Sequence, residues 1–380
     1  MAIKATPTFS LKDQLFNKEK VSMIAGEIQV VYPAFEQATF TKIVVDKFPE
    51  LELMDRLLWI RDCLHDFLPN DYRQAVEILL ESLPPPNDPT LTDDDFGDFI
   101  YGPYGAFVAE YGCIKQDLQF SLDAIKEMTT RFSCEFPIRS FLNAFPKETL
   151  RQLQKWTNDT HYHVRRLASE GTRPTLPWAK NITIDYRAAL PILDALYADS
   201  TRFVTRSVAN HLNDISKIDP DLVVTTLKRW QQEGMQTDAE MEFITKHSLR
   251  TLEKRGHSGA LALLGYKGGE VELQKFQIST PVVLVGETLE FSFSITSTGE
   301  LAQNLLIDYH LYFQKANGTT APKTFKIAKT TIQPGETLMF TKQQLLRPMT
   351  TRVLYAGEHY VELQVNGQVF PRKKFILQAS

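Results

Sequence analysis

The sequence predicts a multidomain protein of the α-then-β class, an α-solenoid of helical repeats followed by an immunoglobulin-like β-sandwich. Three observations support this prediction. Helical motifs recur 40 residues apart, amphipathic helices follow one another in pairs, and short alternating strands separated by turn residues occupy the final part of the chain. We therefore expect two domains, residues 1–268 and residues 269–380.

The helical repeat shows as a constant offset between two stretches. Asp159 precedes one predicted helix and Asp199 precedes another, and the same offset of 40 relates Arg166 to Arg206. A period near 40 with a helix-capping residue is typical of HEAT-like repeats. Such a repeat is a helix pair that buries its apolar face only by stacking on its neighbours, so we expect a solenoid with a long concave surface.

Helices are predicted over most of the first 268 residues. Apolar residues at helical spacing mark 34–48 and 51–67, and the proline-rich stretch 83–89 must end any helix. The glycine-rich, aromatic segment 101–105 is expected to be a loop that leads into a helix from about Ala106. Later helices are expected at 117–129, 135–144, 147–157, 161–170, 186–197, 201–215, 219–233 and 238–255.

The pattern changes after Gly268-Gly269. Polar and apolar residues alternate in 289–295 and 360–365, as in strands with one buried face. The pair Asn366-Gly367 predicts a type I′ hairpin turn. The segment lacks the Cys…Trp…Cys set, so the expected sandwich is not of the antibody type.

Composition places the chain among ordinary globular proteins, with 43% hydrophobic and 23% charged residues. No apolar run approaches about 18 residues, and the N-terminal segment lacks the apolar region of a signal peptide. The three cysteines have no metal-ligand spacing. We expect buried thiols in a reducing cytoplasm, with a catalytic cysteine as the less favoured alternative. No metal or cofactor is expected.

Charge is distributed unevenly. Residues 1–129 hold 11 basic and 22 acidic residues, 130–270 hold 20 and 16, and 271–380 hold 11 and 8. An acidic first third would repel a polyanion, whereas evenly spaced arginines on the later repeats would suit the phosphates of DNA. Basic clusters at 323–329 and 372–374 either mark solvent-facing strand positions or help to grip DNA.

Carboxylates lie near arginines in otherwise apolar helices. Glu135 and Arg139 are four residues apart and would share a helix face, and Glu170 lies among several arginines. Structural ion pairs are the alternative interpretation. Trp178 follows two prolines, in a loop or a first helical turn, although a lone Trp more often belongs to a core. No nucleotide-binding loop, HExxH motif or CxxC motif is present.

Several segments resemble the AlkC branch of bacterial alkylpurine DNA glycosylases. The motif Glu-Phe-Pro-Ile-Arg at 135–139 departs from the family pattern at Pro137, which is tolerable in a first helical turn. The resemblance covers roughly residues 9–268 and is specific over 130–266. Its segments are 134–142, 164–179, 208–217, 249–252 and 260–266.

The resemblance implies HEAT-like repeats, to which some members add an immunoglobulin-like domain. Family members excise cationic N-alkylated purines, chiefly 3-methyladenine, and the related AlkD branch does so without flipping the base. For this chain it implies a monomeric, monofunctional glycosylase that acts on alkylated duplex DNA at the nucleoid of a bacterial cytoplasm.

A cationic purine leaves as a neutral base, so its excision needs little acid catalysis. Hydrolysis builds an oxocarbenium-like sugar, which nearby carboxylates can stabilise while one of them positions water. A non-catalytic repeat scaffold that binds DNA or protein is the alternative function. We expect Glu135, Glu170, Asp214 and Trp178 to be catalytic, and Arg139, Arg165, Arg166, Arg173, Arg206, Arg250 and His211 to bind DNA. Glu170 and Asp214 would both lie on the wet concave surface.

Overall fold

The computed structural model describes residues 10–91, 96–347 and 353–379. The chain forms two compact units. Unit 1 comprises the chain up to Ile215 together with Gly234–Ile244, and unit 2 comprises Ser216–Glu233 together with the chain from Thr245. Helices precede strands, as the sequence predicts, whereas the proposed domain boundary at 268/269 stays a prediction.

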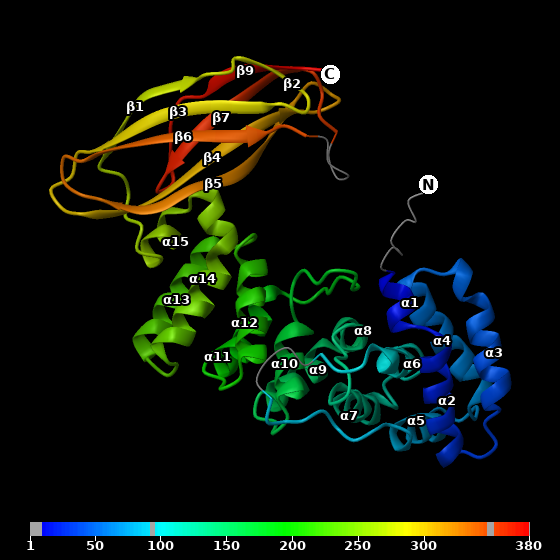
Figure 1. Ribbon diagram of the computed structural model, residues 1–380. Helices are drawn as coiled ribbons and strands as arrows, with labels where there is room; N and C mark the ends of the chain where they lie inside the picture. Colours follow the sequence, from blue (N-terminus) through cyan, green and yellow to red (C-terminus); the bar gives the residue numbers. More distant parts are fainter. Residues whose placement is uncertain (1–9, 92–95, 348–352, 380) are drawn as a thin grey trace. The chain divides into compact units, whose positions relative to one another are not determined.

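Unit 1 is built from helices that pack mostly against near neighbours in the chain (Figure 1). Three short 3₁₀ segments, Phe48–Glu50, Phe99–Tyr101 and Tyr186–Ala189, join them. The helices are α1 (Leu11–Leu15), α2 (Lys18–Val31), α3 (Gln37–Lys47), α4 (Leu53–Phe67), α5 (Tyr72–Glu81), α6 (Gly102–Tyr111), α7 (Leu118–Thr129), α8 (Pro137–Ala144), α9 (Pro146–Trp156), α10 (Tyr162–Glu170), α11 (Leu190–Leu196) and α12 (Arg202–Ile215).

Helix α6 begins earlier than the sequence predicts. We expected a loop over 101–105, but Gly102, Pro103 and Gly105 are helical. A Cβ atom on Gly105 would come within 2.9 Å of the Pro137 ring and 3.0 Å of the Cys134 sulfur. The absence of a side chain at Gly105 therefore lets α6 pack closely against the start of α8. This packing outweighs the poor helix propensity of glycine.

The predicted 40-residue repeat is confirmed at α10 and α12, which begin 40 residues apart and pack against each other. Asp159 accepts a hydrogen bond from the His161 amide at 2.9 Å, and Asp199 accepts one from the Thr201 amide at 2.9 Å. The same turn, in which an Asp side chain accepts a hydrogen bond from the amide two residues later, thus precedes both helices.

Unit 2 contains the last helices of the chain together with the β-sandwich. Its helices are α13 (Pro220–Glu233), the end of α14 (Asp238–Arg255) and α15 (Ser258–Leu263). Asp219 caps α13, whose first residue is Pro220, as predicted. The strands are β1 (Val271–Ile278), β2 (Val282–Leu284), β3 (Thr288–Ser297), β4 (Gln303–Gln314), β5 (Thr320–Ile332), β6 (Thr337–Leu345), β7 (Gly357–Val365), β8 (Gln368–Val369) and β9 (Lys373–Gln378).

The strands form two sheets that pack face to face (Figure 1). One has the order β1-β3-β6, and the other has the order β2-β9-β7-β4-β5 with β8 beside β7. Alternate residues of the longer strands point into a shared apolar core, in which the rings of Phe291 and Tyr309 meet edge to face at 5.2 Å. Among the described residues, no helix is long and apolar enough to cross a membrane.

The predicted hairpin at Asn366-Gly367 is confirmed, since both residues have positive φ angles, 48° and 83°. The turn also contacts the helical part of unit 2. The Asn366 amide donates to the Lys267 carbonyl at 2.8 Å, and the Gly367 backbone lies close to the carbonyl of Gly256. The sandwich and the end of α14 are therefore joined by backbone contacts that leave no room for a side chain.

Replacing Gly367 by Ala tests this contact. A Cβ atom there would lie 2.4 Å from the Gly256 carbonyl oxygen, in addition to the cost of a positive φ. We expect a loss of about 2–5 kcal/mol in the free energy of unfolding, measured by calorimetry. Gly335→Ala is the control, because Gly335 also has a positive φ but nothing within 4 Å, and should cost about 1–2 kcal/mol. Equal losses would contradict the role given to the contact.

Candidate active site

Carboxylates and arginines gather in unit 1 where α10 and α12 end. Glu170 is the last residue of α10, Asp214 lies in the final turn of α12, and Arg173 follows α10. Arg173 Nη1 lies 2.6 Å from Glu170 Oε1, and its Nε lies 2.8 Å from Asp214 Oδ2. One guanidinium therefore bridges the carboxylates of two successive repeats, which is the fork geometry that arginine favours.

Glu135 joins this group through a second arginine. Arg166 Nη1 donates to Glu135 Oε2 at 3.2 Å and to the Ser133 hydroxyl at 2.9 Å. The same guanidinium lies 3.8 Å from Glu170 and stacks over the ring of Phe203. The result is a continuous row of alternating charge, Glu135, Arg166, Glu170, Arg173 and Asp214. Glu135 precedes α8 and pairs with Arg166 rather than with Arg139, so the expectation that Glu135 and Arg139 share a helix face, and the alternative of an ion pair between them, are both wrong.

The two inner carboxylates are buried, with exposed fractions of 5% for Glu170 and 3% for Asp214. We expected both on a wet surface, and that expectation is wrong. Burial by itself raises the pKa of Glu170, but Arg166, Arg173 and the Ser207 hydroxyl outweigh it and hold this pKa below its ordinary value. Glu170 is therefore ionised at neutral pH although it is enclosed.

His211 is also enclosed, on α12 beside this row. Its Nδ1–H donates to the Ser169 carbonyl at 3.1 Å, and burial lowers the pKa of its ring to about 4. The imidazole is therefore neutral at pH 7. A fully buried neutral ring cannot contact a phosphate, so the expected DNA contact by His211 is wrong. The ring instead lies against the Ser169 carbonyl, next to Glu170.

Two expected DNA-binding arginines have protein partners instead. Arg139 on α8 is completely buried and donates to backbone carbonyls, which leaves no part of it to reach DNA. Arg165 pairs with Asp199 at 2.6 Å rather than with Glu170, because α10 directs it toward the turn that precedes α12. Arg166 and Arg173 are mostly buried within the charged row.

Trp178 is 77% exposed and has a φ angle of 63°, so the core alternative for this residue is wrong. An exposed indole on a left-handed backbone is uncommon and marks a functional candidate. Arg206 on α12 and Arg250 on α14 are partly buried, and Arg250 donates to the His247 carbonyl. DNA contact by Arg206 and Arg250 stays a prediction.

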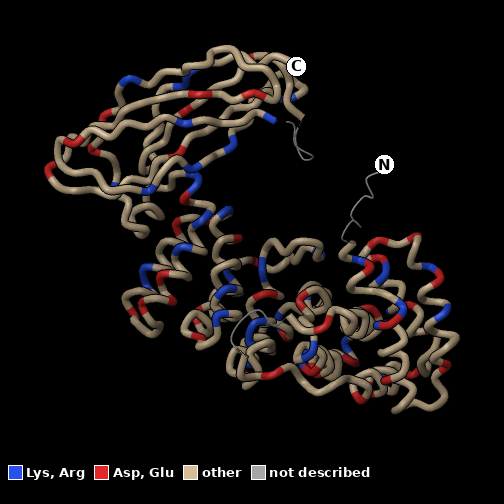
Figure 2. The backbone as a smooth tube through the Cα atoms, viewed as in Figure 1, with Lys and Arg blue, Asp and Glu red and all other residues tan. Residues whose placement is uncertain are grey.

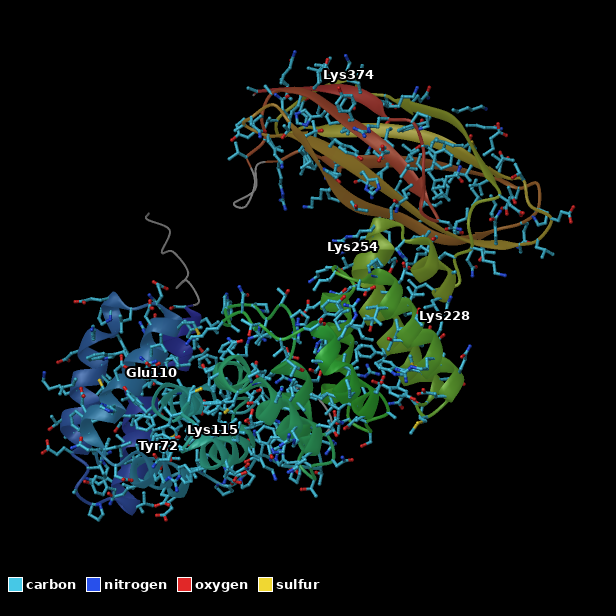
Figure 3. All side chains as sticks on the ribbon, turned by 180° about the vertical axis from the view of Figure 1, so that it is seen from behind. Tyr72, Glu110, Lys115, Lys228, Lys254 and Lys374 are labelled. Carbon is cyan, nitrogen blue, oxygen red and sulfur yellow. The ribbon has the colours of Figure 1, made fainter. Side chains whose placement is uncertain are left out.

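A pocket of about 240 Å³ adjoins the site and was not predicted from the sequence. Its walls are mostly apolar and come chiefly from α4, α6, α8 with the segment before it, and the Trp178 segment. Figure 3 labels Glu110 of α6, one of its few charged wall residues. The residues that line the pocket lie far apart in the chain, so no local sequence pattern indicates that they meet. Within the described residues, no cluster of His, Cys, Asp or Glu suits a metal ion.

Ser207 is a second residue that the sequence did not reveal. Its hydroxyl donates to Glu170 Oε2 at 2.6 Å and lies 3.0 Å from the Ser169 hydroxyl. A single serine in an amphipathic helix resembles any other small buried residue. Only the packing of α12 against α10 makes it a partner of the carboxylate.

The basic clusters of the sandwich are largely neutralised. Lys326 and Lys329 both reach Glu253 at the end of α14, at 2.8 and 3.0 Å. Arg372 pairs with Glu362, and Lys374, labelled in Figure 3, pairs with Glu358. Figure 2 shows acidic and basic residues interspersed over the strands. These four side chains are thus ion-paired within the unit, as solvent-facing strand residues can be, and a grip on DNA by the two clusters stays a prediction.

Fold and site together define a helical-repeat protein with a buried carboxylate–arginine row and a C-terminal β-sandwich. The model of the "DNA alkylation repair enzyme" family matches residues 120–247, and that of the "Uncharacterised protein YhaZ, C-terminal Ig-like domain" matches 272–379. The chain is 35% identical over 361 residues to the uncharacterized protein YhaZ of Bacillus subtilis, covering 94% of this chain and 96% of YhaZ.

Among solved structures, the chain resembles the alkylpurine DNA glycosylase AlkC of Pseudomonas fluorescens bound to DNA containing an abasic site analog. The two are 36% identical, with a TM-score of 0.83 over 98% of this chain and 100% of that one. The chain belongs to the AlkC-type family of DNA alkylation repair proteins, and its sandwich is immunoglobulin-like. Both expectations from the sequence are confirmed.

Removing the bridging arginine tests the electrostatics of the row. Arg173→Met leaves Glu170 and Asp214 buried without their shared cation, so the free energy of unfolding at pH 7 should fall by about 3–5 kcal/mol. In the variant, burial raises the pKa of Glu170. As the pH falls, the difference in stability should shrink, because Glu170 of the variant binds its proton at a higher pH than Glu170 of the wild type, whose pKa lies below the ordinary 4.5.

The control for Arg173→Met is Lys115→Met, which removes an exposed partner of Glu148 and should change the stability little. Figure 3 labels Lys115. Urea unfolding at pH 7 and pH 4 measures both variants. A loss for Arg173→Met that is small, or that is the same at both pH values, would contradict the bridging role.

Proposed function

We propose that this protein is a DNA glycosylase that hydrolyses the N-glycosidic bond of cationic N-alkylated purines, chiefly 3-methyladenine, in duplex DNA. The observation that carries the proposal is the row of three carboxylates held by Arg166 and Arg173. Similarity to AlkC, whose solved structure holds DNA with an abasic site analog, supports DNA as the partner. All three carboxylates come from one chain, so we propose a monomer, acting at the bacterial nucleoid.

The proposed mechanism assigns different tasks to the carboxylates. The departing purine is already cationic and leaves neutral, so the main need is stabilisation of positive charge on the sugar. Glu135 is the most exposed carboxylate of the row, and we assign it contact with the sugar or its attacking water. Glu170 and Asp214 lie behind it and supply fixed negative charge in a dry environment, where electrostatic effects are strong.

Access to the lesion is proposed to occur without base flipping, by bending the duplex and widening a groove. The exposed indole of Trp178 would pack on the sugar face opened in this way. A 2-aminopurine placed beside the lesion reports on unstacking by its fluorescence. An increase typical of an extruded base would contradict this part of the proposal.

The activity is tested by incubating the protein with dimethyl-sulfate-treated DNA and identifying the released bases by chromatography. We expect free 3-methyladenine and an abasic site. Absence of any released base would favour the alternative, a non-catalytic repeat scaffold that binds DNA or protein. Because no lysine stands out as a nucleophile, borohydride should trap no covalent enzyme–DNA adduct, and a trapped adduct would contradict monofunctional hydrolysis.

The carboxylates are tested by isosteric substitutions. Glu135→Gln, Glu170→Gln and Asp214→Asn should each slow single-turnover excision about tenfold or more, which corresponds to about 1.4 kcal/mol of lost transition-state stabilisation. Glu240→Gln is the matched control, because Glu240 is also an ion-paired carboxylate that contacts α12, but near the opposite end of that helix. Wild-type rates in all three site variants would contradict the assignment.

The arginines predicted to clamp phosphates are tested by binding. Arg206→Ala and Arg250→Ala should weaken binding to any duplex, and each should reduce the slope of log K against log salt by roughly one counterion. Fluorescence anisotropy at several salt concentrations measures both quantities. If Arg206→Ala changes neither affinity nor slope, Arg206 is not a phosphate contact.

A further inference from the structure

Arg139 is a buried cation that donates its hydrogen bonds to backbone carbonyls rather than to a carboxylate. Its Nη1 donates to the carbonyls of Gly171 at 3.1 Å and Arg173 at 2.8 Å, and its Nε donates to the carbonyl of Lys180 at 2.5 Å. Burial lowers the pKa of its guanidinium to about 10, so it stays charged at neutral pH. Removing a charged guanidinium from water costs free energy, and hydrogen bonds to the buried group must offset that cost.

The three accepting carbonyls mark the two ends of one segment, residues 171–180. Gly171 and Arg173 follow the C-terminus of α10, where carbonyls lack helical partners and the helix dipole favours a cation. Lys180 lies two residues after Trp178. A single side chain on α8 therefore ties both the start and the end of the segment that carries Arg173 and Trp178.

Packing alone does not fix the end of this segment. Residues 178–180 border the pocket of about 240 Å³, so side chains do not fill the space on that side. Asn143, one turn after Arg139 on α8, donates to the Asn181 carbonyl at 2.9 Å and accepts from the Thr183 amide at 3.0 Å. These bonds hold the chain beyond Lys180 but do not reach the end near α10.

We propose that Arg139 is a positioning residue, which fixes Trp178 and the backbone of Arg173 relative to the carboxylate row by closing the 171–180 segment at both ends. The proposal rests on the proposed glycosylase function for its kinetic consequence only. Lysine keeps the charge but has no planar fork, so one ammonium group cannot reproduce the three bonds. Arg139→Lys should therefore free the segment while DNA binding elsewhere persists.

Trypsin gives a test that does not depend on activity. The bond after Lys180 is exposed, but its carbonyl is held by Arg139, and a protease needs a locally unfolded chain. In the wild-type protein this bond should resist cleavage, and in Arg139→Lys it should be cut about tenfold faster or more. Rapid cleavage there in the wild type would overturn the proposal even if the variant failed to fold.

Kinetics give the second test, on DNA that carries 3-methyladenine. Arg139→Lys should lower the single-turnover excision rate about tenfold or more and change the Kd for DNA less than about threefold, because misplacement affects the transition state. If Arg139 acts through Trp178, the double variant with Trp178→Ala should be no slower than Trp178→Ala alone. Independent, multiplicative losses, or a wild-type rate in Arg139→Lys, would overturn the proposal.

Arg56 provides a matched control. It is another buried arginine that donates to three backbone carbonyls, those of Lys12, Phe16 and Phe48, and it differs from Arg139 in pairing with the exposed Asp13 at 2.8 Å. Arg56→Lys should lower the melting temperature but leave both the cleavage after Lys180 and the excision rate of the folded protein unchanged. If Arg56→Lys changed both as much as Arg139→Lys, the effect would be general destabilisation and the proposal would fail. Loss of excision in every protein, with cleavage as expected, would refute only the proposed function.

Discussion

The salt bridges of Arg173 are the interaction on which the site depends. This guanidinium lies between Glu170 and Asp214, which belong to successive repeats and are both buried. Without it, two negative charges would be enclosed together, and a cause that lowers the pKa of Glu170 against the effect of burial would be lost. With it, the helix ends can pack closely while Glu170 stays ionised. The ion pairs of Arg173 thus keep Glu170 charged and at the same time link the ends of α10 and α12.

This arrangement explains why so many polar groups of unit 1 are buried close to one another. Ser207 donates to Glu170, His211 is neutral and donates to the carbonyl before Glu170, and Arg166 links Glu170 to Glu135. Each group limits the orientations of its neighbour, so the row is fixed before any DNA arrives. Preorganised charge of this kind needs little rearrangement during a reaction.

Unit 2 uses charge for a different purpose. Lys326 and Lys329 converge on Glu253, so the sandwich is attached to the end of α14 by an ion pair next to the glycine contact at Gly367. Nearby, burial raises the pKa of Asp308 to about 6. Lys326 and Lys329, two of the basic residues that seemed available to a polyanion, are therefore paired within this unit.

The sequence by itself determined the helical class of the first part, the strands of the last part, the 40-residue repeat and the Asn366-Gly367 turn, because periodicity and turn chemistry act over a few residues. Family resemblance also singled out Glu135, Glu170 and Asp214. Only the tertiary structure decided their partners. Arg139 donates to carbonyls, Arg165 pairs with Asp199, and Ser207 donates to Glu170. Helix packing brings these groups together although each pair lies more than 30 residues apart in the chain. Burial, which depends on all neighbouring elements at once, likewise decided that His211 is enclosed and Trp178 is free.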